Sequence, residues 1–158
     1  KGRRNIIYTK HKGTFIIDYA HTTQAYKEIY KDFKTDNLVT TLFGCGGDRD
    51  KTKRKSIGRI VEEYSKKIFI TEDNSRSEDF IKISEDILKG INKKSKCLIE
   101  KSRKKALNKL FNQSRRDDIN FILGKGSENY IHRDKQKIKH NDLEYIENMI
   151  KKNEIKNI

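Results

Sequence analysis

Charged residues and glycines gather in four short segments, and each segment directly follows an apolar run. The carboxyl ends of neighbouring parallel strands meet at one edge of a sheet, where α/β proteins bind their ligands. Apolar runs that form such strands would place all four segments around one site. The segments are Asp18 to His21, Gly44 to Asp50, Glu72 to Arg76 and Gly124 to Glu128.

The last three segments carry side chains that suit an amino acid. Arg49 and Arg76 supply guanidinium groups, whose paired N–H donors match a carboxylate. Asp73 and Glu128 supply carboxylates that accept hydrogen bonds from an ammonium group, and Asn74 adds an amide. Two arginines indicate two carboxylates on the ligand. Taken alone, the Asp73-Asn74 pair favours a helix cap with Arg76 in solvent.

The glycine-rich segment does not match a nucleotide-binding motif. The fingerprint G-x-G-x-x-G requires glycine or alanine where Arg49 stands, and the chain has no G-x-x-x-x-G-K-[ST] loop for an ATP triphosphate. For Asp48 and Asp50 two interpretations stay open, a ligand contact or a tight turn that braces the next helix. Cys45 is typical of a small residue that fills a tight space. With no metal-ligand spacing and no nucleophile constellation, we expect no metal site and no catalytic residue here.

Composition and charge restrict the class of protein. The chain has 158 residues, which suits one domain, and a formal net charge of +14. No apolar run is long enough to span a membrane, and the presence of only two cysteines indicates the reducing cytoplasm. Much of the excess charge lies between Lys89 and Arg116, which holds 11 basic residues and one acidic residue. We interpret these lysines and arginines as the solvated face of an amphipathic helix. A basic nucleic-acid-binding α/β module is the alternative.

Short apolar runs alternate with longer amphipathic ones, which predicts an α/β fold. The pattern indicates a doubly wound, mainly parallel sheet with helices on both faces, and Tyr130 to His140 as a short hairpin or a loop. The expected strands are 5–9, 14–18, 38–43, 67–71, 97–100 and 120–123, and the expected helices are 22–33, 53–65, 77–91, 103–112 and 142–152.

Together, the four segments resemble the C-terminal domain of the Mur ligases, the ATP-dependent amino-acid ligases of peptidoglycan synthesis. The resemblance covers nearly the whole chain and is nearest to the branch that adds the third residue of the peptide, the UDP-N-acetylmuramoyl-tripeptide synthetases. The matching motifs are Asp18-Tyr-Ala-His-Thr22, Phe43-Gly-Cys-Gly-Gly-Asp-Arg-Asp-Lys51 with Lys53-Arg54, Asp73-Asn-Ser-Arg76 and Gly124-Lys-Gly-Ser-Glu128.

The resemblance implies a role for each site residue. Arg49 would hold the carboxylate beside the attacking amine of a diamino acid, and Arg76 with Asn74 would hold its distal carboxylate. The distal ammonium group would be held by Asp73, the Gly124 carbonyl and Glu128. Arg3 and Asp18 match family positions that reach the ATP ribose when the domains close, and His21, close by, is assigned to ATP with them. From the residue alone, His21 is more typical of an exposed surface histidine.

The resemblance also implies that residues 1–158 are one domain of a three-domain enzyme. The domain that binds the UDP-sugar and the central ATPase, which binds most of the ATP and Mg²⁺, are absent from this chain. We therefore expect it to be a piece of a longer cytoplasmic protein, in keeping with a first residue that is not Met. The isolated domain should neither hydrolyse ATP nor form the amide. Its partners would be the diamino acid and, through the other domains, ATP and UDP-N-acetylmuramoyl-L-alanyl-D-glutamate, with no nucleic acid and no membrane.

Arg76 predicts the acceptor, because in this family an arginine here goes with meso-diaminopimelate, whereas lysine-adding members generally lack it. We expect meso-diaminopimelate or a two-carboxylate analogue such as lanthionine. The sequence departs from the family pattern where a proline is replaced by Thr23, Lys55 or Ser75, and where a histidine is replaced by Ser127. Loss of proline at 75 frees one backbone angle and puts acceptor selectivity in question. Folylpolyglutamate and cyanophycin synthetases, which are related amide ligases, are further alternatives.

Overall fold

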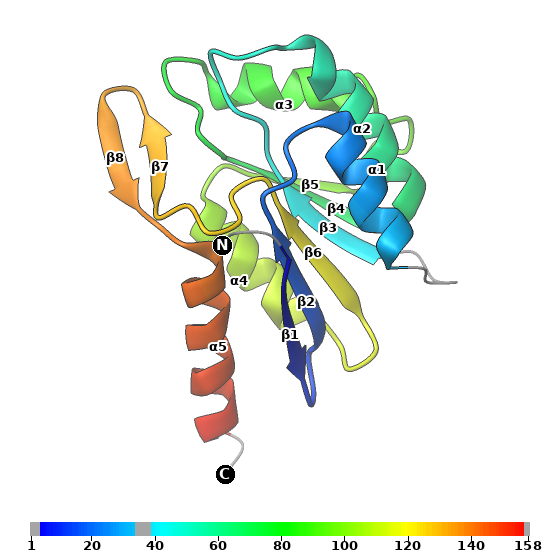
Figure 1. Ribbon diagram of the computed structural model, residues 1–158, viewed down its shortest axis with the longest axis vertical. Coiled ribbons are helices and arrows are strands. Elements are labelled where there is room, and N and C mark those ends of the chain that lie inside the picture. Colours follow the sequence, from blue (N-terminus) through cyan, green and yellow to red (C-terminus); the bar gives the residue numbers. More distant parts are fainter. Residues whose placement is uncertain (1–3, 34–38, 157–158) are drawn as a thin grey trace.

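A six-stranded sheet forms the centre of the computed structural model, which describes residues 4–33 and 39–156. The strands are β1 (Asn5–Thr9), β2 (Gly13–Asp18), β3 (Val39–Phe43), β4 (Ser65–Thr71), β5 (Cys97–Glu100) and β6 (Ile119–Leu123). The helices are α1 (Thr23–Asp32), α2 (Thr52–Tyr64), α3 (Phe80–Leu88), α4 (Arg103–Gln113) and α5 (Asp142–Lys156), with a short 3₁₀ helix at Lys94–Lys96. A separate hairpin, β7 (Tyr130–Arg133) and β8 (Gln136–Lys139), precedes α5 (Figure 1).

The strand order is β1-β2-β6-β3-β4-β5. The edge strand β1 is antiparallel to β2, and all other neighbours are parallel. Every described residue of β3 is buried, as expected for a parallel strand covered on both faces. The prediction of a mainly parallel α/β sheet is confirmed, and the segment after β6 is a hairpin.

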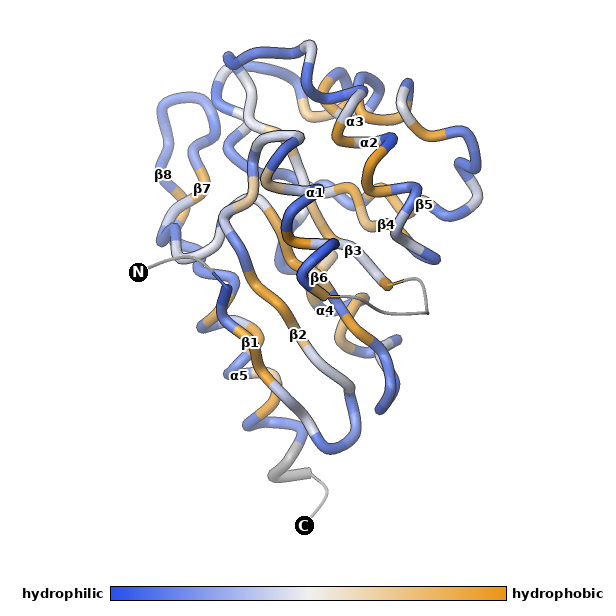
Figure 2. Tube along the Cα trace, turned by 45° about the vertical axis from the view of Figure 1, so that its right-hand side comes forward, coloured by the Kyte–Doolittle hydropathy of each residue, from blue (hydrophilic) through white to orange (hydrophobic). Residues whose placement is uncertain are grey.

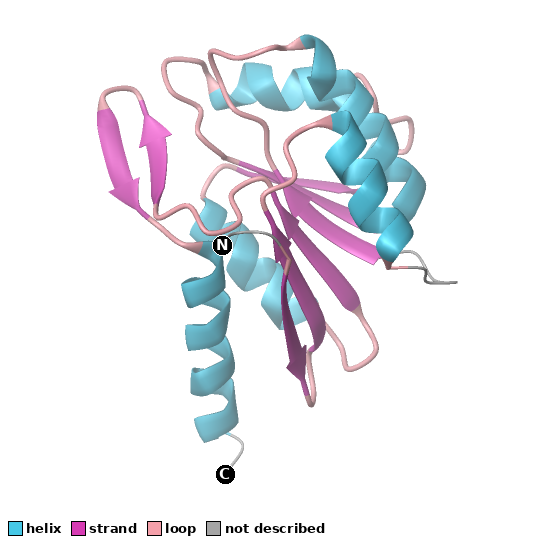
Figure 3. Ribbon diagram, in the orientation of Figure 1, coloured by secondary structure: helices cyan, strands magenta, loops and turns pink. Residues whose placement is uncertain are grey.

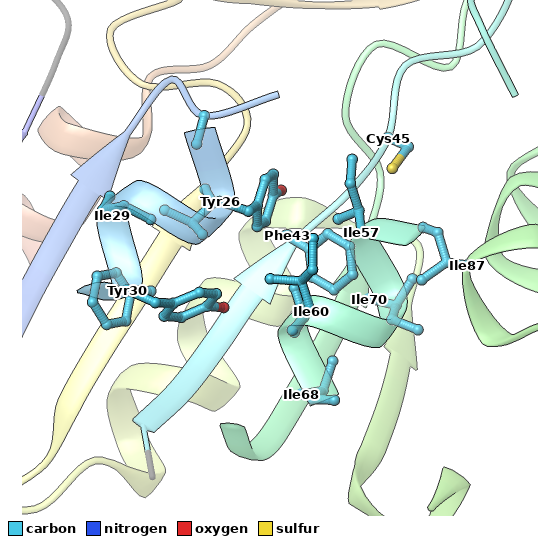
Figure 4. Packing of buried hydrophobic residues seen from close by; sticks show 14 of the residues in the cluster. Tyr26, Ile29, Tyr30, Phe43, Cys45, Ile57, Ile60, Ile68, Ile70 and Ile87 are labelled. Carbon is cyan, nitrogen blue, oxygen red and sulfur yellow. The ribbon is translucent and has the colours of Figure 1, made fainter. Parts of the chain in front are cut away.

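Helices cover both faces of the sheet (Figure 3). On one face α1, α2 and α3 pack against the strands through a cluster that includes Tyr26, Phe43 and Ile57, shown in Figure 4. On the other face α4 and α5 pack through a second cluster that includes Leu107 and Ile146. Figure 2 shows the hydrophobic residues running along the strands and recurring along the helices. The two clusters thus hold the strands from both faces of the sheet, and the strands in turn position the loops at their carboxyl ends.

Two expectations about local structure need correction. The third helix begins at Phe80 rather than at 77, because Asp79 accepts a hydrogen bond from the Ile81 N–H and so caps it there. In the basic segment, Lys104, Lys105 and other lysines are exposed as expected, but Arg103 is 1% exposed. The pattern signalled only that α4 is amphipathic, and Arg103 lies on its inner side. No helix within residues 4–33 and 39–156 is long and apolar enough to cross a membrane.

Candidate functional site

The four predicted segments meet at the carboxyl ends of the parallel strands, above the sheet and beside the β7–β8 hairpin (Figure 3). They surround a cavity of about 470 Å³. This cavity contains all six residues expected to contact an amino acid, and it adds others that the sequence did not single out. Its lining residues are Tyr19, His21, Gly46, Arg49, Asp50, Lys53, Asp73, Asn74, Arg76, Gly124 and Glu128.

A buried arginine supports the glycine-rich loop. Arg54 is 0% exposed and donates hydrogen bonds to both Glu78 oxygens at 2.7 Å, to Asp86 at 3.1 Å and to the Gly46 carbonyl at 3.0 Å. The loop also lies directly on the segment after β4, because a Cβ at Gly47 would stand 1.9 Å from the Ser75 carbonyl oxygen. Only glycine permits this approach. The two loops are therefore locked together.

Asp48 and Asp50 both have structural roles in this arrangement. Asp48, at a left-handed φ of 51°, accepts hydrogen bonds from the Ser77 N–H and hydroxyl, which lower the pKa of its carboxyl. Asp50 accepts from the Thr52 N–H at 2.9 Å and from its hydroxyl at 2.6 Å at the start of α2. Of the two interpretations left open, bracing of the turn fits both residues, although Asp50 also borders the cavity.

The two arginines of the site differ in how firmly they are held. The Arg76 side chain donates through Nη1 to the Gly47 carbonyl at 2.8 Å and to the Asn74 carbonyl at 3.3 Å. Arg49 is exposed at the rim and has no hydrogen bond or ion pair with any other described residue. The helix-cap interpretation, with Arg76 in solvent, is wrong, because Arg76 is half-buried against the glycine-rich loop.

Asp73, Asn74 and Glu128 form a connected cluster around Lys125, which is 0% exposed. The Lys125 ammonium group lies 2.7 Å from Glu128 Oε2 and 3.6 Å from Asp73 Oδ1, and it donates to Asn74 Oδ1 at 3.0 Å. Asn74 Nδ2 donates to Glu128 Oε2 at 3.0 Å. Burial raises the pKa of the Glu128 carboxyl, but the Lys125 hydrogen bond and charge outweigh it and leave that pKa below its ordinary value. Two carboxylates and one ammonium give this cluster a net charge of −1.

Gly124 lies directly against the Asp73 carboxylate of this cluster. Its φ is +105°, and a Cβ built there would lie 2.7 Å from Asp73 Oδ2. Its N–H donates to the Asp18 carbonyl at 3.1 Å, which ties the β6 loop to the β2 loop. Glycine is therefore required for both the backbone conformation and the closeness of the carboxylate.

Two of the three residues expected to reach ATP, Asp18 and His21, border a second cavity of about 290 Å³, which shares Tyr19 and His21 with the first. Asp18 is 8% exposed, and its carboxylate accepts from the N–H groups of Arg4 and Ala20. His21 is exposed, and its Nδ1 lies 3.0 Å from the Tyr19 carbonyl oxygen. Arg3 lies outside the described residues.

Buried ionic groups that the sequence reasoning missed hold the strand ends in place. Arg103 pairs with Asp142, which is 0% exposed, and donates to the carbonyls of Glu72 and Leu123 at the ends of β4 and β6. Lys125 and Arg54 stand inside the recognised motifs, but no role was expected for either. Nothing in their spacing signals burial, because a charged residue is by default a surface residue.

The described part of the chain contains no group of three or more metal-binding side chains. Cys45 is buried against the core, and burial raises the pKa of its thiol to about 12, so it does not supply a thiolate near neutral pH. The cavity thus presents guanidinium, carboxylate and amide groups, which are the groups that form hydrogen bonds with charged ligands.

The fold and the cavity together define an α/β domain with a mainly parallel sheet, whose strand ends carry both guanidinium and carboxylate groups. The sequence profile of the Mur ligase, glutamate ligase domain family matches residues 2–126, and the chain belongs to that family.

Relatives agree with this assignment. The chain is 46% identical over 129 residues to the UDP-N-acetylmuramoyl-L-alanyl-D-glutamate--2,6-diaminopimelate ligase of Helicobacter pylori (82% of this chain, 28% of the relative). It is 38% identical over 155 residues to the ligase of the same name from Buchnera aphidicola (97% and 31%). The chain therefore spans about three tenths of the length of these curated relatives.

Solved structures give the same result. A UDP-N-acetylmuramoyl-L-alanyl-D-glutamate--2,6-diaminopimelate ligase superposes with a TM-score of 0.88 at 29% identity, covering 98% of this chain and 32% of that one. A bifunctional folylpolyglutamate synthase/dihydrofolate synthase from Yersinia pestis superposes with a TM-score of 0.57 at 12% identity, covering 78% and 28%. The second likeness shows a shared fold only.

Proposed function

We propose that this chain is the amino-acid-binding C-terminal domain of an ATP-dependent ligase of peptidoglycan synthesis. The ligase joins a diamino acid with two carboxylates, meso-diaminopimelate or a close analogue, to UDP-N-acetylmuramoyl-L-alanyl-D-glutamate. The observation that carries the proposal is the meeting of Arg49, Arg76, Asp73, Asn74 and Glu128 in one cavity at the strand ends. The names of the relatives point to the same reaction.

The charges of the cavity match those of the proposed acceptor. Arg49 and Arg76 supply two positive charges for two carboxylates. The cluster of Asp73, Glu128 and Lys125 carries a net charge of −1, which one ammonium group neutralises. The second amino group has no carboxylate assigned to it and enters the reaction as a neutral amine. Lysine has only one carboxylate and would leave one arginine without its partner.

Each side chain then has a defined task. Arg76, held by the Gly47 carbonyl, binds the distal carboxylate together with Asn74. Asp73, the Gly124 carbonyl and Glu128 bind the distal ammonium group. Arg49, at the rim, binds the carboxylate beside the reacting amine. These residues orient the amine and perform no bond-making step themselves.

The remaining chemistry belongs to the other domains of the ligase. The central domain supplies the P-loop and Mg²⁺ and transfers the γ-phosphoryl group of ATP to the side-chain carboxylate of D-glutamate. The amine nitrogen then attacks the acyl carbon, inorganic phosphate leaves, and a proton is released as the amide forms. Asp18 and His21 border the second cavity, where we place the ATP ribose after domain closure. We place the whole enzyme in the cytoplasm, with no nucleic acid or membrane as partner.

The test measures amide formation by the full-length ligase with meso-diaminopimelate, lanthionine and lysine. A charge-assisted hydrogen bond contributes about 1.5–3 kcal/mol, so kcat/KM for meso-diaminopimelate should exceed that for lysine by about ten- to a hundredfold. Arg76→Gln should remove most of this preference. Arg59→Gln, an exposed arginine of α2 outside the cavity, is the matched control and should leave it unchanged. A wild-type enzyme that prefers lysine contradicts the proposed acceptor.

A second experiment separates the ligase domain from the alternative based on its charge. The isolated chain should show no ATP hydrolysis and no amide formation, because it lacks a P-loop. It should also bind random DNA or RNA weakly at physiological salt in a gel-shift assay. Tight binding that falls steeply with added salt favours a nucleic-acid-binding module instead.

A further inference from the structure

The β7–β8 hairpin lies directly against the backbone of Arg76. The Arg76 N–H donates to the His132 carbonyl at 2.9 Å, and the Asp134 N–H donates to the Arg76 carbonyl at 2.6 Å. Arg76 and Arg133 thereby form a parallel bridge outside the main sheet. The His132 N–H also donates to Asn74 Oδ1 at 3.0 Å. The hairpin therefore contacts both residues that we assign to the distal carboxylate.

Arg76 needs such support because its backbone is in a conformation that arginine seldom adopts. Its φ is 51°, in the left-handed region, where a Cβ is disfavoured. Residues in this region keep their conformation only when the surroundings fix it. The direction in which the Arg76 side chain leaves the backbone therefore depends on what holds the segment from 72 to 76.

A buried carboxylate connects this segment to the hairpin. Glu72, 1% exposed, accepts hydrogen bonds from Arg133 Nε at 2.8 Å and from Arg133 Nη2, and its Oε1 also accepts from the Ser75 hydroxyl at 2.8 Å. Burial raises the pKa of the Glu72 carboxyl, but the Arg133 and Ser75 hydrogen bonds outweigh it and leave that pKa below its ordinary value. Glu72 therefore stays ionised near neutral pH and holds both groups.

Neither Glu72 nor Arg133 is among the residues that line the cavity, whereas Arg76 is. We infer that Arg133, acting through Glu72 and Ser75, is a positioning residue that fixes the direction of Arg76 and thereby sets the selectivity for an acceptor with a second carboxylate. This inference rests on the proposed function, because Arg76 is assigned there to the distal carboxylate.

The experiment compares acceptors in the full-length ligase. In Arg133→Gln, KM for meso-diaminopimelate should rise about tenfold while kcat/KM for lysine stays within twofold, since lysine has no distal carboxylate for Arg76. Arg133→Lys keeps the charge but loses the paired donors, and it should give a smaller rise. Lys109→Gln, which breaks an ion pair with Glu100 outside the cavity lining, is the control and should change neither value.

A double-mutant cycle separates positioning from a general effect on folding. In an Arg76→Gln background, Arg133→Gln should cause no further loss of selectivity, because its effect passes through Arg76. Equal losses of kcat/KM for both acceptors, or full additivity with Arg76→Gln, overturn the inference. Should Arg133→Gln fail to fold, Ser75→Ala decides the matter, since it removes a single hydroxyl from the same carboxylate and should lower the selectivity at least twofold.

The same data distinguish this inference from the proposed function. If Arg76→Gln alone leaves the preference for meso-diaminopimelate intact, the assignment of Arg76 is wrong, and the inference falls with it. If Arg76→Gln removes the preference but Arg133→Gln and Ser75→Ala do not, the proposed function stands and only the positioning role is refuted.

Discussion

Replacing Asp142 by asparagine should strongly destabilise the domain. Asp142 is 0% exposed and Arg103 is 1% exposed, and they pair through two contacts, Nε to Oδ1 at 2.8 Å and Nη2 to Oδ2 at 2.7 Å. His140 Nε2 lies 2.7 Å from Asp142 Oδ1. Asparagine keeps the shape of the side chain but removes its charge, which leaves a buried guanidinium group with only carbonyl partners.

Loss of one partner from a buried ion pair costs about 3–5 kcal/mol. For a chain of this size each kcal/mol shifts the melting temperature by about 2–4 °C, which gives a decrease of roughly 6–20 °C. Urea denaturation measures the free energy of unfolding. Asp32→Asn is the matched control, because it makes the same substitution in an ion pair with Arg4 that is 47% exposed on both sides. We expect it to cost about 0–1 kcal/mol. An Asp142→Asn variant that loses no more than Asp32→Asn refutes the reasoning.

The pH dependence gives an independent check on this pair. Burial raises the pKa of the Asp142 carboxyl, but the charge and hydrogen bonds of Arg103 outweigh it, so the pKa lies well below its ordinary value. A carboxyl with a lowered pKa contributes stability above its unfolded value, about 3.9, and loses it as the pH falls toward the folded value. The wild-type chain should therefore lose stability below about pH 4 more steeply than Asp142→Asn does.

Three further predictions concern the site. Hydrogen bonds from Arg54, from the Asp48 N–H and from Lys51 lower the pKa of Glu78 from 4.5 to about 2, with Arg54 the largest cause. Part of the free energy of unfolding should therefore disappear as the pH falls from 4.5 to 2, and urea denaturation should show a shallower loss in Glu78→Gln. Gly124→Ala places a Cβ 2.7 Å from Asp73 Oδ2 at a φ of +105°. The substitution should lower the free energy of unfolding, measured by urea denaturation, by about 1–3 kcal/mol and should raise KM for the acceptor. An unchanged KM contradicts this. Lys125→Met keeps the length of the side chain but removes the positive charge between the carboxylates of Asp73 and Glu128. The two carboxylates then take up protons at higher pH, so the acidic limb of the profile of KM against pH should move to higher pH. An unmoved limb refutes this role of Lys125.

The order of strands and helices along the chain could be predicted from the sequence because the buried strands are short, continuous apolar runs between amphipathic helices. The expected bounds of β1 and β5 agree with the structure, since turn residues or charges flank both runs. The position of β6 between β2 and β3 could not be predicted this way. Which strands become neighbours depends on packing across the whole sheet, and no local pattern encodes it.

The cavity residues were predictable for a related reason, because each follows a strand and the parallel topology brings the strand ends together. The groups that hold them were not. Lys125, Arg54 and Arg103 look like surface cations in a chain with 37 lysines and arginines. Arg54 and Arg103 pair with carboxylates that are distant in sequence, Glu78 and Asp142. Lys125 pairs with Glu128 three positions later, but it also lies against Asp73, which belongs to another loop. Asp142 lies 39 positions after Arg103, so neither residue signals the other.

This division between held and free residues bears on how the acceptor would bind. Asp73, Glu128 and Lys125 are connected to one another, and Arg76 is held by the glycine-rich loop, so the distal half of the site is formed before any ligand arrives. Arg49 is exposed at the rim and has no partner among the described residues. A preformed half requires little ordering on binding, whereas Arg49 must lose side-chain freedom. On the proposed function, the distal end of the diamino acid therefore supplies selectivity in the open enzyme, and Arg49 engages its carboxylate as the domains close and the amine meets the acyl phosphate.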